Sequence, residues 1–580
     1  MNQGASRRSS AAWPLLLLIA PLVFIGLAAI GGSLRYSPVP YWDMWDGYLD
    51  FFIKASGGDL AVWWAQHNEH RIVFSRLLFW IDLALMDGGS TPFLIVCNYL
   101  LAAGCVLIFH QFLRALVAGV EGRAVRLAII SLVCVLSFSW VQADNFTWGF
   151  QSGFFSAQLL PLTALYLLGR SLSTSSGHGG LFAGAGALGA ASAGTMAGGV
   201  AVLPIMALAT VIARPRAWRK QLVLAALAGI VLLAYFHGYQ SPSGHGKVLD
   251  TLLGDPAGLL QFMVFYLGSP AFHFVSGGSL VAATVAGIVT LLAVVLIALR
   301  VLLARSRDPM IVCLLAFAGY LLAMALAVAG GRLALGLNTA FSGRYATPAL
   351  MLWCALLVLS GACLHQRHGR NIRRYAAALG GLAVATSLLL LPSQLRALEA
   401  DRDAGFRFLV AALALELEVH DAATIKRIYP YPDALLAIQR EAARRDLSIF
   451  GHPALRDASL SLGQLAQEQP HSSCAGYVDQ IAEVAPDTRF VQVSGWIFHP
   501  ASGRVPHSAS LLDQEGRIIG HVVTGASRPD VAAAVDERAG RSGFGGYLLA
   551  GRRDAIAFLE GRGVECRLRV GSPTANRHPG

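Results

Sequence analysis

Ionisable side chains that could do chemistry gather in one stretch of the sequence, residues 33–90. Asp43 and Asp46 are three residues apart, and four further candidates follow them: His67, Glu69, His70 and Arg71. A carboxylate can act as the base that removes a proton from a hydroxyl group, and a planar guanidinium can hold a phosphate through two parallel hydrogen bonds. The stretch is therefore a candidate site for proton transfer beside a bound phosphate, although Asp43 and Asp46 could also simply cap a helix.

The same stretch leaves metal binding open. His67 and His70 have the spacing of two metal ligands on one face of a helix. No third ligand is evident from the sequence, so the identity of any metal is unknown. We therefore predict no definite cofactor and keep a divalent metal ion as an alternative.

Further polar candidates lie in two later segments. In QADNFTWGFQSGFF (142–155), polar groups could bind sugar hydroxyls by hydrogen bonding and stacking, or could anchor the chain at a membrane interface. In FSGRYATPALMLW (341–353), a guanidinium could stabilise the charge of a phosphate. The candidates are Asp144 and Gln151 in the first segment, and Arg344 and Tyr345 in the second.

The elements that must position these residues are membrane-spanning helices. The 580-residue chain is 55% hydrophobic and only 14% charged, with a mean hydropathy of +0.56. Soluble domains carry about 25% charged residues, so the composition excludes a disordered or collagen-like chain and indicates a polytopic α-helical membrane protein. Much of the net charge of +11 sits in short loops between apolar runs, and no nucleic-acid-binding motif occurs, so nucleic acid is not an expected partner.

Apolar runs predict about eleven spans within residues 1–392. They lie at 11–30, 91–113, 127–143, 152–170, 180–196, 198–213, 221–237, 279–304, 310–330, 345–364 and 374–392. The Arg-rich loops all fall on one side of this arrangement, which the positive-inside rule makes the cytoplasm. The loop 33–90 and all residues after 392 are then outside. The run 257–275 could be another span, but Asp255-Pro256 and Gly268-Ser269-Pro270 favour an interfacial or re-entrant helix.

The membrane part, about residues 1–392, resembles a known superfamily. A first span, a long outside loop with helix-period segments at 45–55 and 59–83, and an Asp just beyond the span end are similar to the GT-C integral-membrane glycosyltransferases. The closest branch includes protein O-mannosyltransferases and lipid A aminoarabinose transferases. Arg344, Tyr345 and Pro348 match that branch's Arg-Tyr-x-x-Pro motif, whereas Asp43-x-x-Asp46 departs from its adjacent acidic pair or Asp-x-Asp.

The resemblance implies a polyprenyl-phosphate sugar as donor and a hydroxyl of a lipid, glycan or protein as acceptor. Asp43 would be the base, with Asp46 as a supporting or alternative carboxylate. Arg344 would hold the lipid phosphate. The remaining candidates would complete the donor site: Tyr345, His67, His70 and Arg71, with Glu69 orienting one of them, and Asp144 and Gln151 near the sugar.

The composition changes after residue 392. Residues 393–470 are charged and helix-periodic, and 471–580 contain short alternating strands with Gly and Pro turns, which predict a β-sandwich or jelly-roll-like domain. Gly495-Trp496 and Gly543-Phe544 resemble small β modules appended to bacterial glycan enzymes. Cys474 and Cys566 are the only cysteines outside the apolar spans, so we predict a disulfide between them in an oxidising compartment.

The sequence as a whole therefore predicts a multi-pass glycosyltransferase of a bacterial inner membrane, with a periplasmic carboxy-terminal domain. It would transfer a sugar from a polyprenyl-phosphate carrier at the periplasmic face, among membrane lipids. Two other functions stay open: a polysaccharide polymerase or lipid-linked glycan flippase, and a non-catalytic envelope binding protein. A flippase needs a polar path through the membrane, whereas the predicted spans are nearly free of ionisable residues.

Overall fold

The computed structural model describes residues 12–86, 88–90, 92–119, 122–173, 179–241, 246, 248–303, 307–367, 372–467 and 472–570. The chain forms two compact units. One comprises residues 1–33, 63–77 and 92–399, and we call it the membrane unit; the second unit comprises 34–62, 78–91 and 400–580. The loop predicted to project from the first span is thus divided between both units, and its two outer parts fold with the carboxy-terminal region.

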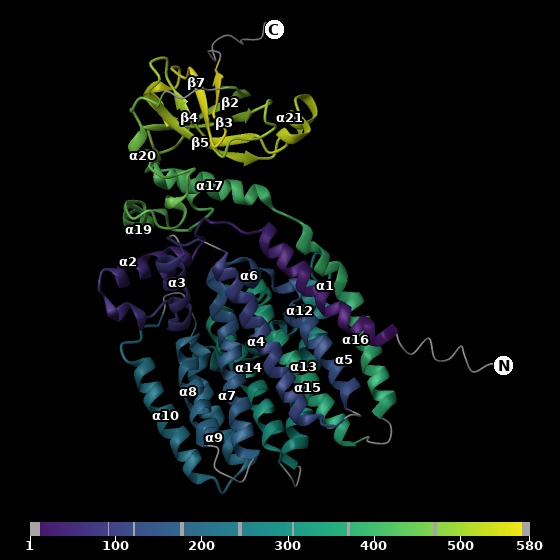
Figure 1. Cartoon of the computed structure of the whole chain (residues 1–580). Helices are drawn as coiled ribbons and strands as arrows, with labels where there is room; N and C mark the ends of the chain where they lie inside the picture. Colours follow the sequence, from purple (N-terminus) through teal and green to yellow (C-terminus); the bar gives the residue numbers. More distant parts are fainter. Residues whose placement is uncertain are drawn as a thin grey trace, which may run out of the picture. The chain divides into compact units, whose positions relative to one another are not determined.

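Nine helices within the described residues are long and apolar enough to cross a membrane. Figure 1 shows these helices running alongside one another in the membrane unit. They are α1 (Ala12–Leu34), α4 (Phe93–Leu116), α5 (Arg123–Ser137) with the short helices that extend it to Thr147, α7 (Ser152–Ser173), α10 (Trp218–Phe236), α13 (Leu280–Leu303), α14 (Pro309–Arg332), α15 (Ala346–Arg367) and α16 (Ile372–Leu395). The first and last of them, α1 and α16, lie side by side, where Gln394 Nε2 donates to the Phe24 carbonyl at 2.9 Å.

Two of the predicted spans form shorter helices. The runs 180–196 and 198–213 give α8 (Gly179–Ala191) and α9 (Val202–Ala213), of 13 and 12 residues, whereas a span needs about 20 residues. The short turns η5 (Ser192–Gly194) and η6 (Ala197–Ala201) separate them. The tight backbone there explains the glycines: an added Cβ at Gly199 would lie 1.9 Å from the Ser192 carbonyl oxygen.

The run 257–275 forms a helix that continues through Pro270, so the interruption predicted there is not seen. It gives α12 (Pro256–Phe274), which meets α11 (Val248–Gly254) at a bend of 116°. Asp255 caps α12 by accepting a hydrogen bond from the Gly258 N–H at 2.8 Å. Counting this bent pair as one span gives ten, so the described residues support nine or ten spans by length and composition in place of the predicted eleven.

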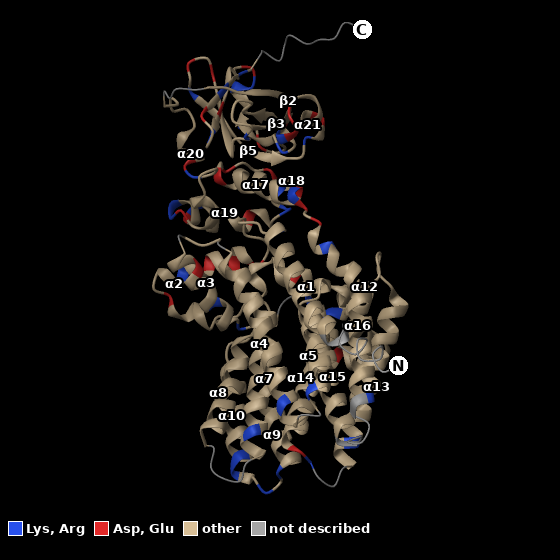
Figure 2. Ribbon diagram, turned by 45° about the vertical axis from the view of Figure 1, so that its right-hand side comes forward, with Lys and Arg blue, Asp and Glu red and all other residues tan. Residues whose placement is uncertain are grey.

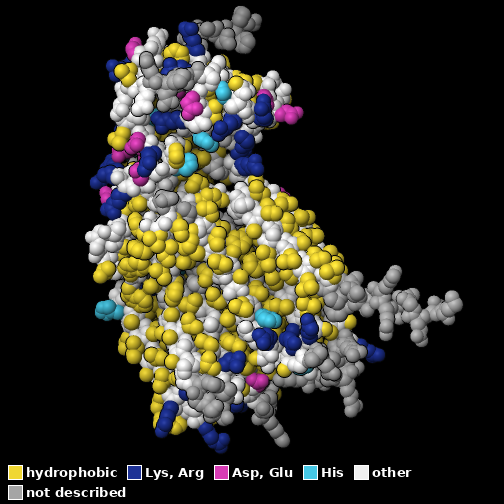
Figure 3. All heavy atoms as spheres, in the orientation of Figure 1, with side chains coloured by type: hydrophobic (Ala, Val, Ile, Leu, Met, Phe, Trp, Pro, Cys, Tyr) yellow, Lys and Arg dark blue, Asp and Glu magenta, His cyan; other side chains and the backbone are white. Residues whose placement is uncertain are grey.

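The surface of the membrane unit suits a lipid environment. Figure 3 shows a broad cover of hydrophobic side chains over its helices, and α13 alone exposes Val281, Val285, Val289 and Leu296 by more than half. Figure 2 shows Lys and Arg gathered at the end where α9 leads into α10. Arg214, Arg216 and Arg219 are exposed there. This one-sided charge agrees with the predicted orientation; parts of the other basic loops (304–306, 368–371) lie outside the described residues.

The helical part of the second unit joins the first loop to the carboxy-terminal region. From the loop come η1 (Trp45–Asp50), α2 (Phe51–Ser56) and the later part of α3 (Val73–Leu85); from the carboxy-terminal region come α17 (Arg402–Glu416), α18 (Ala422–Ile425), α19 (Pro432–Arg444) and α20 (Ala458–Ser461). Backbone hydrogen bonds join the two, from Trp42 N to Ile428 O and from Ser448 N to Gly88 O, each 2.8 Å. The Trp45 ring packs edge-on against Phe450.

The carboxy-terminal strands form one sheet, which differs from the predicted two-sheet sandwich. Its strands are β1 (Ser472–Ser473), β2 (Ala475–Glu483), β3 (Phe490–Phe498), β4 (Ser508–Leu512), β5 (Ile518–Ala526), β6 (Gly543–Leu549), β7 (Phe558–Arg562) and β8 (Cys566–Arg569). Their order is β1-β8-β7-β4-β5-β6-β3-β2. The two edge strands, β1 and β2, are consecutive in the chain and only Cys474 separates them. The sheet must therefore curl until its edges meet.

The predicted disulfide is confirmed. Cys474 and Cys566 are bonded, with Cα atoms 5.3 Å apart. Cys474 lies between the two edge strands and Cys566 begins β8, so the bond ties together the place where the curled sheet closes. Both residues also belong to the buried core of the sheet, with Val493, Leu511 and Val522.

Candidate functional site

The residues 67–70 form a tight turn in the membrane unit. His67 and His70 exchange backbone hydrogen bonds of 2.8 and 2.9 Å, and Asn68 has a positive φ of 48°. The helix-period segment 59–83 is thus interrupted, with η2 (Leu60–Trp63) before the turn and α3 after it. The prediction that His67 and His70 share a helix face is wrong, because a left-handed residue and a reversal lie between them.

The turn packs against the segment that connects α8 to α9. The Ala197 N–H donates to His70 Nδ1 at 3.1 Å, and an added Cβ at Gly194 would lie 3.2 Å from Val73 Cβ. Small residues in the run 184–199 therefore make room for the turn. Nothing in the sequence of this run indicates its contact with His70.

The side chain of Arg71 forms hydrogen bonds with backbone carbonyls. Its buried guanidinium donates to the carbonyls of Trp64, Tyr235 and His237, the last two at 2.9 and 2.8 Å. It also lies over the rings of Trp64 and Tyr235. These contacts fix the turn segment to the end of α10. They show no donor group of Arg71 directed toward a ligand, so its predicted role as a phosphate contact gains no support.

Glu69 pairs with an arginine that the sequence analysis did not select. Arg332 Nη2 donates to Glu69 Oε1 at 2.9 Å, and both side chains are about three-quarters buried. Arg332 is the last residue of α14. The same carboxylate oxygen lies 3.6 Å from His70 Nε2, which is longer than a hydrogen bond.

The environment favours an ionised Glu69 and a neutral His70. Burial opposes ionisation of Glu69, but His70 and Arg332 outweigh it and lower the pKa of the carboxyl to about 2. Burial lowers the pKa of His70 to about 4, opposed by Glu69 and reinforced by His67, Arg332 and Arg344. At neutral pH, His70 is therefore uncharged. Because its Nδ1 accepts the Ala197 N–H, its proton is on Nε2.

The predicted Arg-Tyr segment is held by the residues 142–145. Asn145 Nδ2 donates to the Arg344 carbonyl at 2.9 Å and to Thr347 Oγ1 at 2.6 Å. Thr347 in turn donates to Gln142 Oε1 at 2.5 Å. The two polar segments that the sequence selected separately thus form one hydrogen-bonded group at the start of α15.

A pocket of about 360 Å³ opens in the connection between α14 and α15. Arg332 and Arg344 both line it, together with Asn338, Thr339, Ser342 and Tyr345 among others. Arg344 Nε is buried and has no hydrogen-bond partner within the described residues, although the guanidinium lies 5.6 Å from the centre of the Tyr345 ring. A guanidinium whose Nε has no partner can bind an anionic oxygen without losing an existing bond at that atom.

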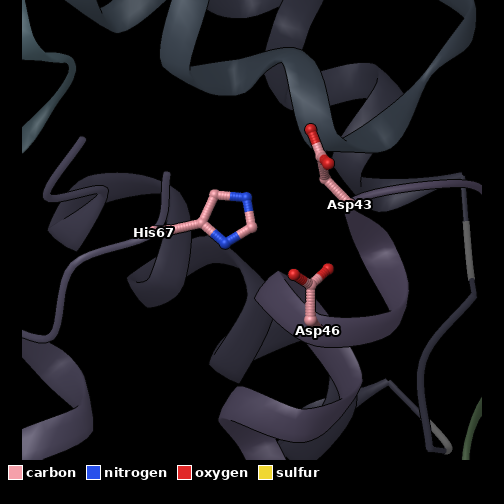
Figure 4. A group of neighbouring side chains, drawn as sticks. All are labelled: Asp43, Asp46 and His67. Atoms are coloured by element: carbon pink, nitrogen blue, oxygen red, sulfur yellow. The ribbon is translucent and has the colours of Figure 1, made fainter. Parts of the chain in front are cut away.

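Asp43 and Asp46 belong to the second unit. Figure 4 shows both carboxylates projecting from neighbouring turns of the chain, and their oxygens lie within 4.8 Å of each other. The backbone is unusual here, since Trp42 has a φ of 48° and η1 is a π-helix. Such features often accompany functional sites. Burial, followed by the field of Asp46 and then Asp43, raises the pKa of Tyr429 to about 12.

The predicted site residues therefore fall into two groups. The membrane unit brings together Glu69, His70, Arg344 and Tyr345, with Asp144 beside the Arg-Tyr segment, and adds Arg332. His67, which Figure 4 also draws, is buried in this unit and packs against Phe150, and the buried Gln151 follows Phe150. Sequence reasoning missed Arg332 because an Arg at a span end is common as an interfacial anchor.

Comparison with known proteins identifies no relatives. The chain matches no protein-family model, and no curated protein matches it.

Proposed function

We propose that this protein is a membrane glycosyltransferase that takes a sugar from a polyprenyl-phosphate carrier and transfers it to a hydroxyl group of a lipid, glycan or protein. In this proposal it belongs to a bacterial inner membrane, and its carboxy-terminal unit is in the periplasm. The observation that carries the proposal is the pocket between α14 and α15, which two arginines, Arg332 and Arg344, both line. The pocket lies at the end of spanning helices, where a lipid-linked phosphate would be found.

The chemistry asks for an anion site and a base. The bond between the sugar's anomeric carbon and the phosphate oxygen breaks, and the polyprenyl phosphate leaves with the electron pair of that bond. A guanidinium at this oxygen stabilises the negative charge that develops there. A new bond forms between the anomeric carbon and the acceptor oxygen, whose proton passes to a carboxylate. Arg344, with its unpartnered Nε, suits the first role.

The acceptor base is proposed to be Asp43, with Asp46 as the supporting carboxylate. The carboxylate oxygens of the two residues lie within 4.8 Å of each other, so Asp46 is close enough to support Asp43 in this role. The unusual backbone at Trp42 and η1 gives these two residues a fixed geometry. Removing a catalytic base typically lowers the rate by about 10²–10⁴-fold.

The donor site is tested by binding of decaprenyl phosphate to the full-length protein in lipid nanodiscs. We expect Arg344→Ala to weaken binding about tenfold or more. Arg300→Ala is the matched control, because Arg300 is an exposed arginine of the same unit, in the last turn of α13, and it should bind as the parent does. Absence of binding by the parent, or equal binding by Arg344→Ala, would overturn the donor site.

The transfer step is tested with a panel of polyprenyl-phosphate pentoses and hexoses and membrane extracts as acceptor. We expect one donor to release polyprenyl phosphate in the presence of acceptor, and Asp43→Asn to lower that rate while leaving decaprenyl phosphate binding unchanged. A parent that binds the lipid phosphate but consumes no donor would favour a transport or binding protein instead.

A further inference from the structure

We propose that Glu69 sets the headgroup preference of the pocket by holding Arg332, so that the pocket favours a ligand phosphate with one negative charge over one with two or more. The proposal rests on the proposed function of this pocket as a lipid-phosphate site. In this proposal Glu69 is a positioning residue, which acts through Arg332. Arg332 contacts the ligand only when it is released from Glu69.

The two arginines of the pocket differ in their partners. Arg332 Nη2 is bonded to Glu69 Oε1 at 2.9 Å, whereas no described residue forms an ion pair with Arg344, and its Nε is buried without a hydrogen-bond partner. One guanidinium is therefore available to an incoming anion and one is already neutralised. Asp144, beside Gly343, adds a negative charge next to the Arg-Tyr segment without lining the pocket.

The surroundings of Glu69 keep it in this arrangement. The Tyr235 hydroxyl donates to the Glu69 backbone carbonyl at 2.8 Å, and His70 beside it is fixed by the Ala197 N–H. His70 is neutral at neutral pH, so it adds no positive charge that could replace Arg332 in the pair. The carboxylate thus sits on a turn that is held at the Glu69 carbonyl and at the His70 ring, and Arg332 pairs with the carboxylate at this fixed place.

A phosphodiester such as a polyprenyl-phosphate sugar carries one negative charge, which Arg344 alone can neutralise. A phosphate monoester carries nearly two negative charges at pH 8, since its second pKa is about 6. To bind the second charge, the pocket would need Arg332, and releasing Arg332 would break its largely buried ion pair with Glu69, which is costly. The arrangement therefore distinguishes a sugar-loaded carrier from the free carrier phosphate, and so favours release of the product.

The experiment compares two probes of equal chain length and different charge, methyl farnesyl phosphate and farnesyl phosphate. Dissociation constants are measured at pH 8 and one salt concentration on the full-length protein in nanodiscs. The variants are Glu69→Gln, Arg332→Gln and the double variant. Asp250→Asn is the control, because Asp250 is an exposed carboxylate of α11 in the same unit and its removal changes the net charge equally.

We expect the parent to bind methyl farnesyl phosphate more tightly than farnesyl phosphate. Glu69→Gln should shift the ratio of the two dissociation constants about tenfold toward farnesyl phosphate, because Arg332 becomes available. The double variant should return to the parental ratio, and Asp250→Asn should keep it. A return in the double variant separates the proposal from a structural role of Glu69, since damage to the fold would not be repaired by removing a second side chain.

Three outcomes would contradict either the role of the Glu69–Arg332 pair or the proposed function of the pocket. If Glu69→Gln and Arg332→Gln both keep the parental ratio while binding both probes, the headgroup preference is not set by this pair. If Asp250→Asn shifts the ratio as Glu69→Gln does, the effect is one of total charge and the pair is again excluded. If the parent binds neither probe, the proposed function of the pocket fails before the question of preference arises.

Discussion

The carboxylate of Asp144 occupies the space in front of Gly343. An added Cβ at Gly343 would lie 2.6 Å from Asp144 Oδ2 and 3.1 Å from its Cγ. Two segments far apart in the sequence thus meet at a point where only a hydrogen atom fits. Because Gly343 directly precedes Arg344, this contact couples the position of an acidic side chain to that of the arginine proposed to bind the donor phosphate.

We expect Gly343→Ala to weaken binding of decaprenyl phosphate about tenfold while the protein still folds. The methyl group must displace the Asp144 carboxylate or shift the backbone at Arg344, and a backbone shift there would move the guanidinium. The measurement is lipid-phosphate binding in nanodiscs alongside thermal unfolding. Gly319→Ala is the control, because an added Cβ there meets nothing within 4 Å. Parental binding by Gly343→Ala would show that the contact does not position Arg344.

Much of the architecture could be predicted from the sequence, because long apolar runs leave few alternatives. The length of the interruption between α8 and α9 was not predicted, because small residues fill the run 184–199 and its contacts with His70 and Val73 appear only in the structure. The turn at 67–70 was missed for a related reason: the apolar spacing of 59–83 continues across it, and tertiary hydrogen bonds override that pattern.

The residue types in the sequence identified candidate site residues, but they did not show what each side chain contacts. Arg344 was selected because it matches an Arg-Tyr-x-x-Pro motif, and Glu69 because ionisable residues gather in the loop 33–90. Arg71 met the same criterion, yet its guanidinium serves three backbone carbonyls. The sequence cannot distinguish an arginine that binds phosphate from one that donates to backbone carbonyls, because the same guanidinium can do both.

Arg71→Lys should therefore lower stability without changing headgroup preference. A lysine ammonium cannot reach three carbonyls from a planar fork, and each buried carbonyl left without a partner costs about 1–3 kcal/mol. The unfolding temperature of the full-length protein in detergent measures this loss. Arg219→Lys, on the exposed surface of α10, should leave it unchanged. A shift in the ratio of the two farnesyl probes in Arg71→Lys would instead place Arg71 in the pocket's chemistry.

The disulfide should matter most for closure of the curled sheet. Cys474 and Cys566 are separated by 92 residues, and in the chain-entropy model a loop of this size contributes up to about 4–5 kcal/mol. We expect Cys474→Ser and Cys566→Ser to lower the denaturant midpoint of the carboxy-terminal sheet by similar amounts. Cys97→Ser, in α4, serves as the control. Thiol labelling of the denatured, non-reduced protein should leave only Cys474 and Cys566 unmodified, and labelling of both would contradict the bond.

Glu416 should make the second unit less stable as the pH rises. It is buried at the end of α17 and accepts hydrogen bonds from the Ser459 hydroxyl at 3.0 Å and the Ser459 N–H at 3.4 Å. Burial outweighs these bonds and, with the nearby Asp457 and Asp446, raises the pKa of the carboxyl from 4.5 to about 7. The folded state therefore holds a proton that the unfolded chain loses above its ordinary pKa.

The stabilisation from that proton is fully present below about pH 4.5 and disappears as the pH rises through about 7, at a cost of up to about 3 kcal/mol. Glu416→Gln keeps the acceptor for Ser459 and removes the charge. We expect it to match the parent in denaturant midpoint at pH 5 and to exceed it at pH 8, as followed by tryptophan fluorescence. Glu515→Gln, in the exposed turn before β5, should follow the parent at both values. If Glu416→Gln gains nothing at pH 8, the buried carboxyl does not carry the pH dependence.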